Sequence, residues 1–414
     1  MSRARTDAER AHQLIQLAWI AIGVYLVALG IAAVLRVQAD FNLYYRAGSR
    51  VLQGEPIYHL DEPSHFLYAP IFAIAFVPFA ALPLRLAQFA WYLVSAVSLV
   101  ALIRGSGRML LGGERQLTPA LILVPVILCA RFIDNNIEHG QINLPTLALT
   151  VWAIVCAEED RSIASGAMLG TAILIKPFAG LAGLFLLLEG KWRAILSSIA
   201  FGLVLVIAPL LVFGPRGTLD QTIAYMQVVS SMTDRYTTML TNQSATSAVA
   251  RLLSIGARAG TPASHAALFI GTAIELALGA AVIVWLLRTR DSEPRGDFLP
   301  HRFQLAALFC IMPSLVPISW KSYYAALLVP YLLLTFVLWT ARPPSSPTPT
   351  LPLALVTTSA ILNWIPGTRP NHIALFFSAH FLASMALLAA TTAAASWWRQ
   401  SNDCRLTPTR TVNS

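Results

Sequence analysis

The chain has 414 residues, of which 56% are hydrophobic and only 12% are charged. A soluble domain of this length does not have such a composition, so most of the chain must lie in lipid. The net charge of +9 does not indicate a nucleic-acid partner, because the arginines are spread singly between apolar segments. At about 20 apolar residues per spanning helix, the chain has room for about a dozen spans and little else.

Hydropathy predicts a series of membrane helices along the chain. The first, Leu14 to Leu35, is longer than the apolar core of a signal peptide and lacks a clean small-residue cleavage site, so we expect it to be retained. The others lie at about 86–104, 118–133, 142–157, 162–175, 178–189, 193–213, 264–287, 302–318, 323–340, 351–364 and 372–396.

The segment from Phe66 to Pro83 is apolar enough to span but is interrupted by Pro70 and Pro78 and ends in a proline. Whether it crosses decides the face on which every later loop lies. Lysine and arginine near span ends favour the cytoplasm. Most of the positive charge is cytoplasmic only if this segment stays at the interface. We therefore predict a re-entrant or interfacial segment, twelve crossings and cytoplasmic termini.

The predicted protein is an all-α, multi-pass protein of the cell membrane. One transmembrane domain covers residues 1–400, and a polar cytoplasmic tail covers residues 401–414. Residues 36–85 form a first extracytoplasmic loop with interfacial helices. Residues 214–262 form a larger extracytoplasmic loop, in which we expect short amphipathic helices.

With this topology, polar clusters fall at the outer ends of five different helices. Random polar residues would divide between the two faces of the membrane, so this arrangement predicts one shared extracytoplasmic site. The clusters are Asp40 to Gly54, Asn135 to Asn143, Lys176-Pro177, Asn242 to Ser244 and Ser319 to Tyr324.

Asp40 is a carboxylate that directly follows a hydrophobic helix and is flanked by Phe41, Tyr44 and Tyr45. One interpretation is a helix-end residue that caps the next, amphipathic helix, which is a common role for aspartate. The functional interpretation is a general base. Partial desolvation near the bilayer would raise the pKa of the carboxyl group toward a useful value.

Lys176 is the lone lysine of a long apolar run, and a cation at that depth is costly enough to indicate function. Alternatively, its side chain snorkels from a helix end to the lipid head groups. The functional interpretation is a contact with phosphate, for which Lys321 and Arg251 offer further positive charge.

Hydrogen-bonding and aromatic side chains of the same clusters are candidates for binding sugar, which needs paired donors, acceptors and flat apolar faces. A polar loop and an ordinary interfacial aromatic belt are the alternatives. Glu138 and His139 lack the spacing of a metal site, so we predict no metal ligands and leave metal dependence open. The candidates are Tyr44, Tyr45, Tyr68, Asn136, His139, Gln141, Asn143, Asn242, Gln243, Trp320, Tyr323 and Tyr324.

Together these motifs resemble glycosyltransferase family 87, a group similar to polyprenyl-phosphate-mannose-dependent mannosyltransferases with the GT-C membrane fold. The resemblance runs from about Asp40 to Tyr331, and it rests on the order and spacing of its motifs. They are DFNLYYRAGSRVLQGEPIY from Asp40, YAP from Tyr68, GQIN from Gly140, SGAMLGTAILIKP ending at Pro177, NQSATSAVARLL from Asn242 and PISWKSYY from Pro317.

The resemblance implies inverting transfer of a hexose, with mannose as the leading sugar, from a polyprenyl phosphate to a hydroxyl of a glycan or glycolipid acceptor. Asp40 matches the family's acidic residue after the first helix, which is the expected base. Mycobacterial members often carry an Asp and two His after the Trp, where this chain has Lys321, Ser322, Tyr323 and Tyr324. The acceptor therefore stays open.

The residue inventory suits this chemistry, because an inverting transfer with a phosphate leaving group needs one base and positive charge for the phosphate. Membrane lipids and the lipid-linked donor are the expected partners, and no cofactor is predicted. The donor's lipid tail would lie in a groove near Pro70 to Pro83. The alternatives are a transporter or flippase for a lipid-linked sugar, which would carry midplane charges and inverted repeats, and a non-catalytic assembly subunit.

Overall fold

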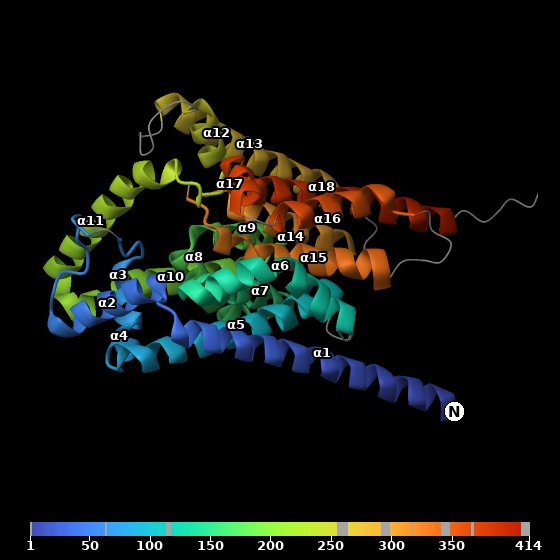
Figure 1. The fold of residues 1–414 in the computed structure, drawn as a ribbon, viewed down its shortest axis with the longest axis horizontal. Coiled ribbons are helices and arrows are strands. Elements are labelled where there is room, and N and C mark those ends of the chain that lie inside the picture. The colour runs from blue at the N-terminus through green and yellow to red at the C-terminus, as the bar shows by residue number, and fades with distance from the viewer. Residues whose placement is uncertain are drawn as a thin grey trace, which may run out of the picture.

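The computed structural model describes residues 2–62, 64–112, 117–254, 264–290, 299–316, 318–340, 348–365 and 368–406. Within these ranges the regular elements are helices, and the extended backbone forms one isolated bridge between Asn242 and Trp320. The prediction of an all-helical protein is confirmed for this part of the chain. Most of the long helices run in roughly the same direction and form an elongated bundle, and α11 curves across one of its ends (Figure 1).

Six helical segments are long and apolar enough to cross a membrane. They lie in α1 (Ser2–Leu35), α5 (Leu84–Leu111), α6 (Pro119–His139), α13 (His265–Arg290), the run η3–α15–η4 (Lys321–Leu327, Leu328–Thr335, Phe336–Thr340) and α18 (Ala379–Leu406). The pair α10 (Trp192–Ile207) and α11 (Leu210–Thr237) is bent by 79° and adds a seventh if it is one span. The chain is therefore a multi-span membrane protein.

The other apolar segments also form helices, but shorter ones. They are α7 (Asn143–Glu158), α8 (Ser162–Ile175), η1 with α9 (Pro177–Ala179, Gly180–Leu188), α14 with η2 (Leu299–Ile311, Met312–Ser314), α16 (Thr350–Asn363) and α17 (Thr368–Phe376), which precedes α18. Each predicted apolar segment thus contains helix. The structure supports six or seven spans by length and composition, and the count of twelve crossings stays a prediction.

The proline-broken segment forms two short helices, α3 (Pro70–Ala75) and α4 (Val77–Ala80). Pro70 is the first residue of α3 and Pro78 the second residue of α4, and in this first turn the missing N–H has no helical partner to lose. Six residues rise about 9 Å, far short of the roughly 30 Å of a bilayer core. Neither helix can cross the membrane alone, and both lie with α2 (Ala39–Gln53) at the end of the bundle away from the N-terminus (Figure 1).

The large loop predicted at 214–262 is mostly helix where the structure describes it. α11 continues past a break at Gly214, whose φ is 67°, and α12 (Ala245–Leu253) follows. Figure 1 shows α11 arching over the same end of the bundle as α2 and α3. α2, α3 and α11 therefore enclose this end, where the predicted polar clusters lie.

Helices α8 and α10 approach closely because small residues face each other. A Cβ added to Gly166 would lie 2.2 Å from the Cβ of Ser197, and one added to Gly170 would lie 2.7 Å from the backbone oxygen of Ser198. Small residues commonly permit such contact between membrane helices. By contrast, an added Cβ at Gly202 on α10 would meet open space.

We expect Gly166→Ala to destabilise the protein, because overpacking a tight interface costs about 1–3 kcal/mol. Gly202→Ala is the matched control, and it should be neutral or slightly stabilising, since alanine favours a helix by roughly 0.5–1 kcal/mol over glycine. Thermal unfolding midpoints of the two variants in detergent measure the difference. Equal midpoints would contradict the close contact of α8 and α10.

Candidate functional site

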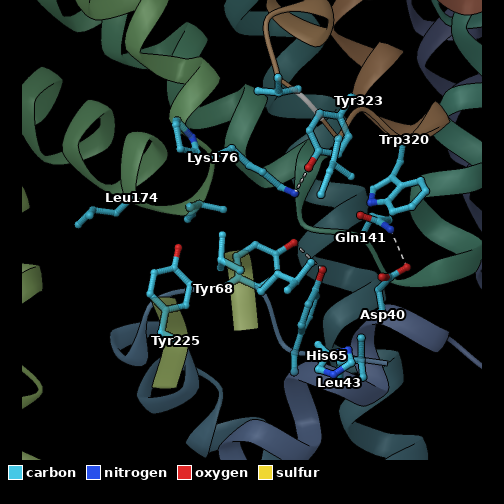
Figure 2. A pocket seen from close by; sticks show the side chains of 17 residues that line it. Asp40, Leu43, His65, Tyr68, Gln141, Leu174, Lys176, Tyr225, Trp320 and Tyr323 are labelled. Atoms are coloured by element: carbon cyan, nitrogen blue, oxygen red, sulfur yellow. Dashed lines mark hydrogen bonds between the residues drawn. The ribbon is translucent and has the colours of Figure 1, made fainter. Parts of the chain in front are cut away.

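Asp40 lies in the first turn of α2 but does not cap it. The N-cap position belongs to Gln38, whose side chain makes no capping bond. The Asp40 carboxylate instead accepts a hydrogen bond of 2.6 Å from Nε2 of Gln141 (Figure 2). Burial raises the pKa of Asp40, and the smaller effects of His139, Lys176 and the Gln141 bond act in the opposite direction.

A buried amide network orients Gln141 toward Asp40. Nδ2 of Asn143 donates to Oε1 of Gln141 at 3.3 Å and to Oγ of Ser322 at 3.0 Å. Nδ2 of Asn136 donates to the backbone oxygen of Ser322 at 2.8 Å. Asn136 and Asn143 are fully buried, so their amides hold other residues in place and do not face a cavity.

The first cavity, of about 280 Å³, lies beside Asp40 and contains Lys176 (Figure 2). Its walls come from α2, the loop before α3, the α8–η1 junction, α11 and the segment before η3. Most of the wall is apolar. The apolar lining residues are Leu43, Leu67, Leu174, Ile175, Pro177, Val229, Val316 and Ile318.

Lys176 follows the last residue of α8, where Pro177 ends the regular helix and starts η1. Its side chain is 91% buried and donates to the hydroxyl of Tyr323. Its Nζ lies 4.3 Å from the ring centroid of Tyr323 and 5.1 Å from that of Tyr68. Within the described residues Lys176 forms no ion pair with a carboxylate. A buried cation held by aromatic rings and a hydroxyl keeps a positive charge that a bound anion would neutralise.

A second cavity, of about 440 Å³, also borders Asp40. The two cavities adjoin, and the carboxylate of Asp40 stands at their junction. Six residues line both of them: Asp40, Leu43, His65, Leu67, Gln141 and Trp320. Most of the side chains that line it carry polar or charged groups, and we call it the polar cavity for that reason. These side chains include Ser64, Arg131, Asn135, His139, Tyr236, Thr241, Lys321 and Asn371.

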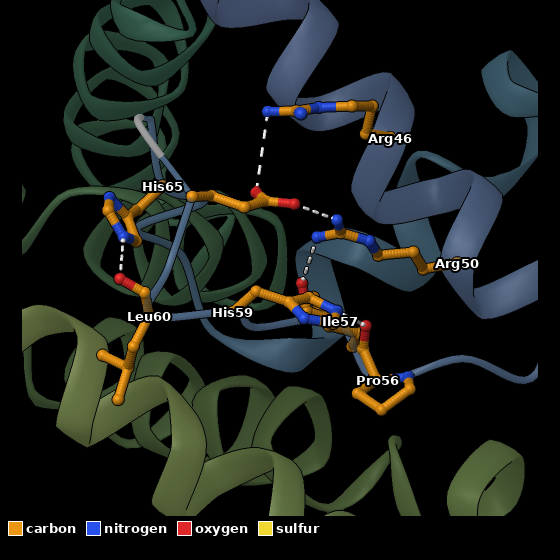
Figure 3. Close-up of polar contacts among 8 residues, drawn as sticks. Arg46, Arg50, Pro56, Ile57, His59, Leu60 and His65 are labelled. Atoms are coloured by element: carbon orange, nitrogen blue, oxygen red, sulfur yellow. Dashed lines mark hydrogen bonds and ion pairs between the residues drawn. The ribbon is translucent and has the colours of Figure 1, made fainter.

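His65, which was not among the predicted site residues, lies on the loop between α2 and α3. Contacts from two arginines of α2 hold this loop in place (Figure 3). Arg50 on α2 donates to the backbone oxygen of Ile57 at 2.9 Å and pairs with Glu62, and Arg46 lies 3.7 Å from the same carboxylate. Nε2 of His65 lies 3.3 Å from the backbone oxygen of Leu60. No motif marks His65 in the sequence, because its position depends on the folding of this loop.

Arg131 was also missed, although it offered a signal. It is a cation within an apolar helix, as Lys176 is a cation within an apolar run. Nη1 of Arg131 donates to the backbone oxygen of Asn363 at 3.0 Å, and Nη2 donates to the side-chain oxygen of Asn371.

Among the described residues, no cluster of three or more His, Cys, Asp or Glu side chains could hold a metal ion.

Several predicted site residues face protein instead of a cavity. The hydroxyl of Tyr45 donates to the backbone oxygen of Leu82 at 2.9 Å, and that of Tyr324 donates to the backbone oxygen of Gln243 at 2.8 Å. Asn242 and Gln243 bind the extended segment before η3. The backbone N–H of Gln243 donates to the backbone oxygen of Ser319 at 2.7 Å, and the backbone N–H of Ser319 donates to Oδ1 of Asn242 at 2.9 Å. By contrast, Tyr44 lines the first cavity, and its hydroxyl lies 3.1 Å from that of Tyr68.

Arg251 lies outside both cavities and acts as a clamp in the fold. Its guanidinium donates to the backbone oxygens of Met239 at 2.7 Å, Asn242 at 2.8 Å and Phe376 at 2.9 Å. These bonds join the end of α11, the NQS segment and α17. The contact with phosphate expected from the sequence would require breaking them, so the geometry favours a structural role.

The fold and the site define a multi-span membrane protein with a ligand site at one end of its helical bundle. The sequence profile of glycosyltransferase family 87 matches residues 66–299, more than half of the chain. The chain therefore belongs to glycosyltransferase family 87, as the sequence motifs indicated, and it is a membrane glycosyltransferase.

Three relatives show the range of proteins that the chain resembles. A polyprenol-phosphate-mannose-dependent alpha-(1-2)-phosphatidylinositol mannoside mannosyltransferase of Mycolicibacterium smegmatis is 28% identical over 81% of this chain and 77% of its own length. A protein of the same name from Mycobacterium tuberculosis is 25% identical over 86% and 83%. An alpha-(1->3)-arabinofuranosyltransferase of Mycobacterium tuberculosis is 28% identical over 45% of each chain.

A pair of methionine variants tests the structural role of Arg251 against the binding role of Lys176. Arg251→Met should lower the thermal unfolding midpoint, because it leaves buried carbonyls without donors at about 1–3 kcal/mol each. Lys176→Met should not lower it, because it removes a buried charge that has no salt bridge among the described residues. Differential scanning fluorimetry of the purified proteins checks both. A large loss of stability in Lys176→Met alone would contradict these assignments.

Proposed function

We propose that this protein transfers a hexose, with mannose as the leading sugar, from a polyprenyl phosphate to a hydroxyl of a glycan or glycolipid. The observation that carries the proposal is the place of Asp40. This carboxylate stands where an apolar cavity with a buried cation adjoins a polar cavity. Two cavities that meet at one carboxylate suit a reaction between two separately bound substrates.

The first cavity suits the donor. A polyprenyl phosphate needs an apolar surface beside a cation, and Leu174 and Ile175 lie next to Lys176 in the cavity wall. Lys176 would bind the phosphate, and Tyr323 and Tyr68 would hold its ammonium group in place. The relatives whose names specify polyprenol-phosphate-mannose align over most of the chain, which supports this donor and this sugar.

The proposed reaction is an inverting displacement at the anomeric carbon. The acceptor oxygen forms the new bond to that carbon while the bond from carbon to the phosphate oxygen breaks and its electron pair leaves with the phosphate. The hydroxyl proton passes to the carboxylate of Asp40. The ammonium group of Lys176 stabilises the charge that develops on the departing phosphate. Polyprenyl phosphate and the new glycoside are the products.

Asp40→Asn tests the base, because the amide keeps the shape of the carboxylate but cannot accept the proton. We expect transfer from polyprenyl-phosphate-mannose to fall about 10²–10⁴-fold. The matched control is Asp160→Asn, which changes an exposed aspartate that pairs with Lys191 at the far end of α7. Radiolabelled mannose transfer by the purified variants measures the rates. Undiminished transfer by Asp40→Asn would remove Asp40 as base and would fit a supporting subunit.

The same experiment has a pH signature. Asp40 works as a base only when it is deprotonated, and burial raises its pKa. The rate of the wild type should therefore decline as the pH falls through this raised pKa and level off above it. Asp160→Asn should keep this acidic decline. Residual transfer by Asp40→Asn should lack it.

For the membrane arrangement we propose a GT-C fold with twelve crossings, cytoplasmic termini and an extracytoplasmic site. The distribution of lysine and arginine supports it, and each of the predicted apolar segments contains helix. The shorter apolar helices, among them α7, α8 and α16, would then also cross. In this arrangement α3 and α4 lie at the outer interface beside the donor cavity.

Single cysteines in a cysteine-free background test the orientation. Gln53, exposed at the end of α2, lies on the side of the site, whereas Arg193, exposed at the start of α10, lies at the opposite end of the bundle. In intact cells Gln53→Cys should react with a membrane-impermeant maleimide and Arg193→Cys should not. Permeabilised cells are the control, in which both should react. The reverse pattern in intact cells would place the site in the cytoplasm.

A further inference from the structure

The second cavity contains two cations from different parts of the chain. Arg131 comes from the middle of α6, and Lys321 is the first residue of η3. Both side chains are partly buried, and they lie close enough for their like charges to interact. Such an arrangement costs free energy unless an anion compensates it.

The nearby carboxylates Glu138 and Asp134 attract Lys321 at longer range, but their direct partners are other side chains. Glu138 pairs with Arg36, and Asp134 accepts the hydroxyl of Tyr25. The bonds of Arg131 go to neutral groups, the oxygen of Asn363 and the amide of Asn371. In the described part of the chain neither Arg131 nor Lys321 has a carboxylate within salt-bridge distance.

Lys321 and Lys176 lie in different cavities, although the sequence suggested that both bind the donor phosphate. Lys176 lines the apolar cavity and Lys321 the polar one, and Asp40 lines both. One phosphate at Lys176 therefore leaves the Arg131–Lys321 pair available. Trp320 adds an aromatic face next to this pair, and the ring of Tyr236 packs edge-on against it at 5.4 Å.

We propose that Arg131 and Lys321 bind an anionic group on the acceptor, so that this glycosyltransferase selects acceptors whose sugar lies near a phosphodiester or a carboxylate. The inference rests on the proposed function, because it takes the polar cavity as the acceptor side. Guanidinium and ammonium groups bind either anion through charge-assisted hydrogen bonds. The two sources of the anion share this chemistry, and the experiment separates them.

The test compares three synthetic acceptors that share one mannose. One carries a plain alkyl chain, one carries the chain through a phosphodiester, and one has a carboxylate at the same distance. The wild type should use at least one anionic acceptor about tenfold or more efficiently than the neutral one, as expected for a charge-assisted bond. The anion that gives the larger preference identifies the natural source. Equal kcat/KM for all three would overturn the inference.

Variants of Lys321 link the preference to the cavity. Lys321→Gln should reduce the preference about tenfold, chiefly through the KM of the anionic acceptor, and Lys321→Arg should retain most of it. Arg193→Gln removes an exposed charge at the far end of the bundle and should keep the full preference. An unchanged preference in Lys321→Gln would overturn the inference.

A measurement of acceptor binding, without sugar transfer, tests this inference independently of the proposed function. Thermal shifts with each acceptor alone should show stabilisation by the anionic acceptor that Lys321→Gln loses. If no lipid-linked sugar is ever transferred, the proposed function fails and this binding result alone decides the inference. A further arm adds polyprenyl phosphate without sugar to the transfer assay, where it competes with the lipid-linked donor and inhibits transfer. If Lys321→Gln weakens its inhibition and leaves acceptor preference intact, Lys321 belongs to the donor and the inference is overturned.

Discussion

The hydrogen bond from Gln141 to Asp40 joins the parts of the site that the sequence keeps far apart. Gln141 stands between α6 and α7, Asp40 begins α2, and Asn143 ties Gln141 to Ser322 in η3. Three distant segments therefore meet at one carboxylate. Because each amide in this network is committed to a neighbour, the side chain of Asp40 is held where the two cavities adjoin.

The buried cations show how the fold balances stability against ligand binding. Arg251 satisfies its guanidinium with backbone oxygens and holds the NQS segment against α17. Lys176 has a hydroxyl and two aromatic rings but no carboxylate within the described residues. The first arrangement is complete in itself, and the second leaves a charge for an anion to balance. This difference, more than burial, separates the structural cation from the proposed binding cation.

The sequence predicted the helical, multi-span character and the family, because both depend on composition and on motifs that are contiguous in the chain. It also identified Asp40 and Lys176, which the structure brings to one cavity. It could not separate Lys176 from Arg251, since both are isolated cations near polar motifs. The partners of a side chain decide its role, and those partners come from other helices. His65 was missed for the same reason, because its position depends on the contacts that hold its loop against α2.

Prolines and a glycine explain why this end of the bundle has room for two cavities. Pro177 stops α8 at Lys176, Pro70 and Pro78 lie in the first turns of the short helices α3 and α4, and Gly214 breaks α11. Each break ends a regular helix where a straight span would continue through the polar end of the bundle. Irregular backbone at membrane depth is tolerated where it lines a cavity or is covered by protein. The breaks that complicated the count of spans are therefore the features that let Asp40 face a polar cavity on one side and an apolar one on the other.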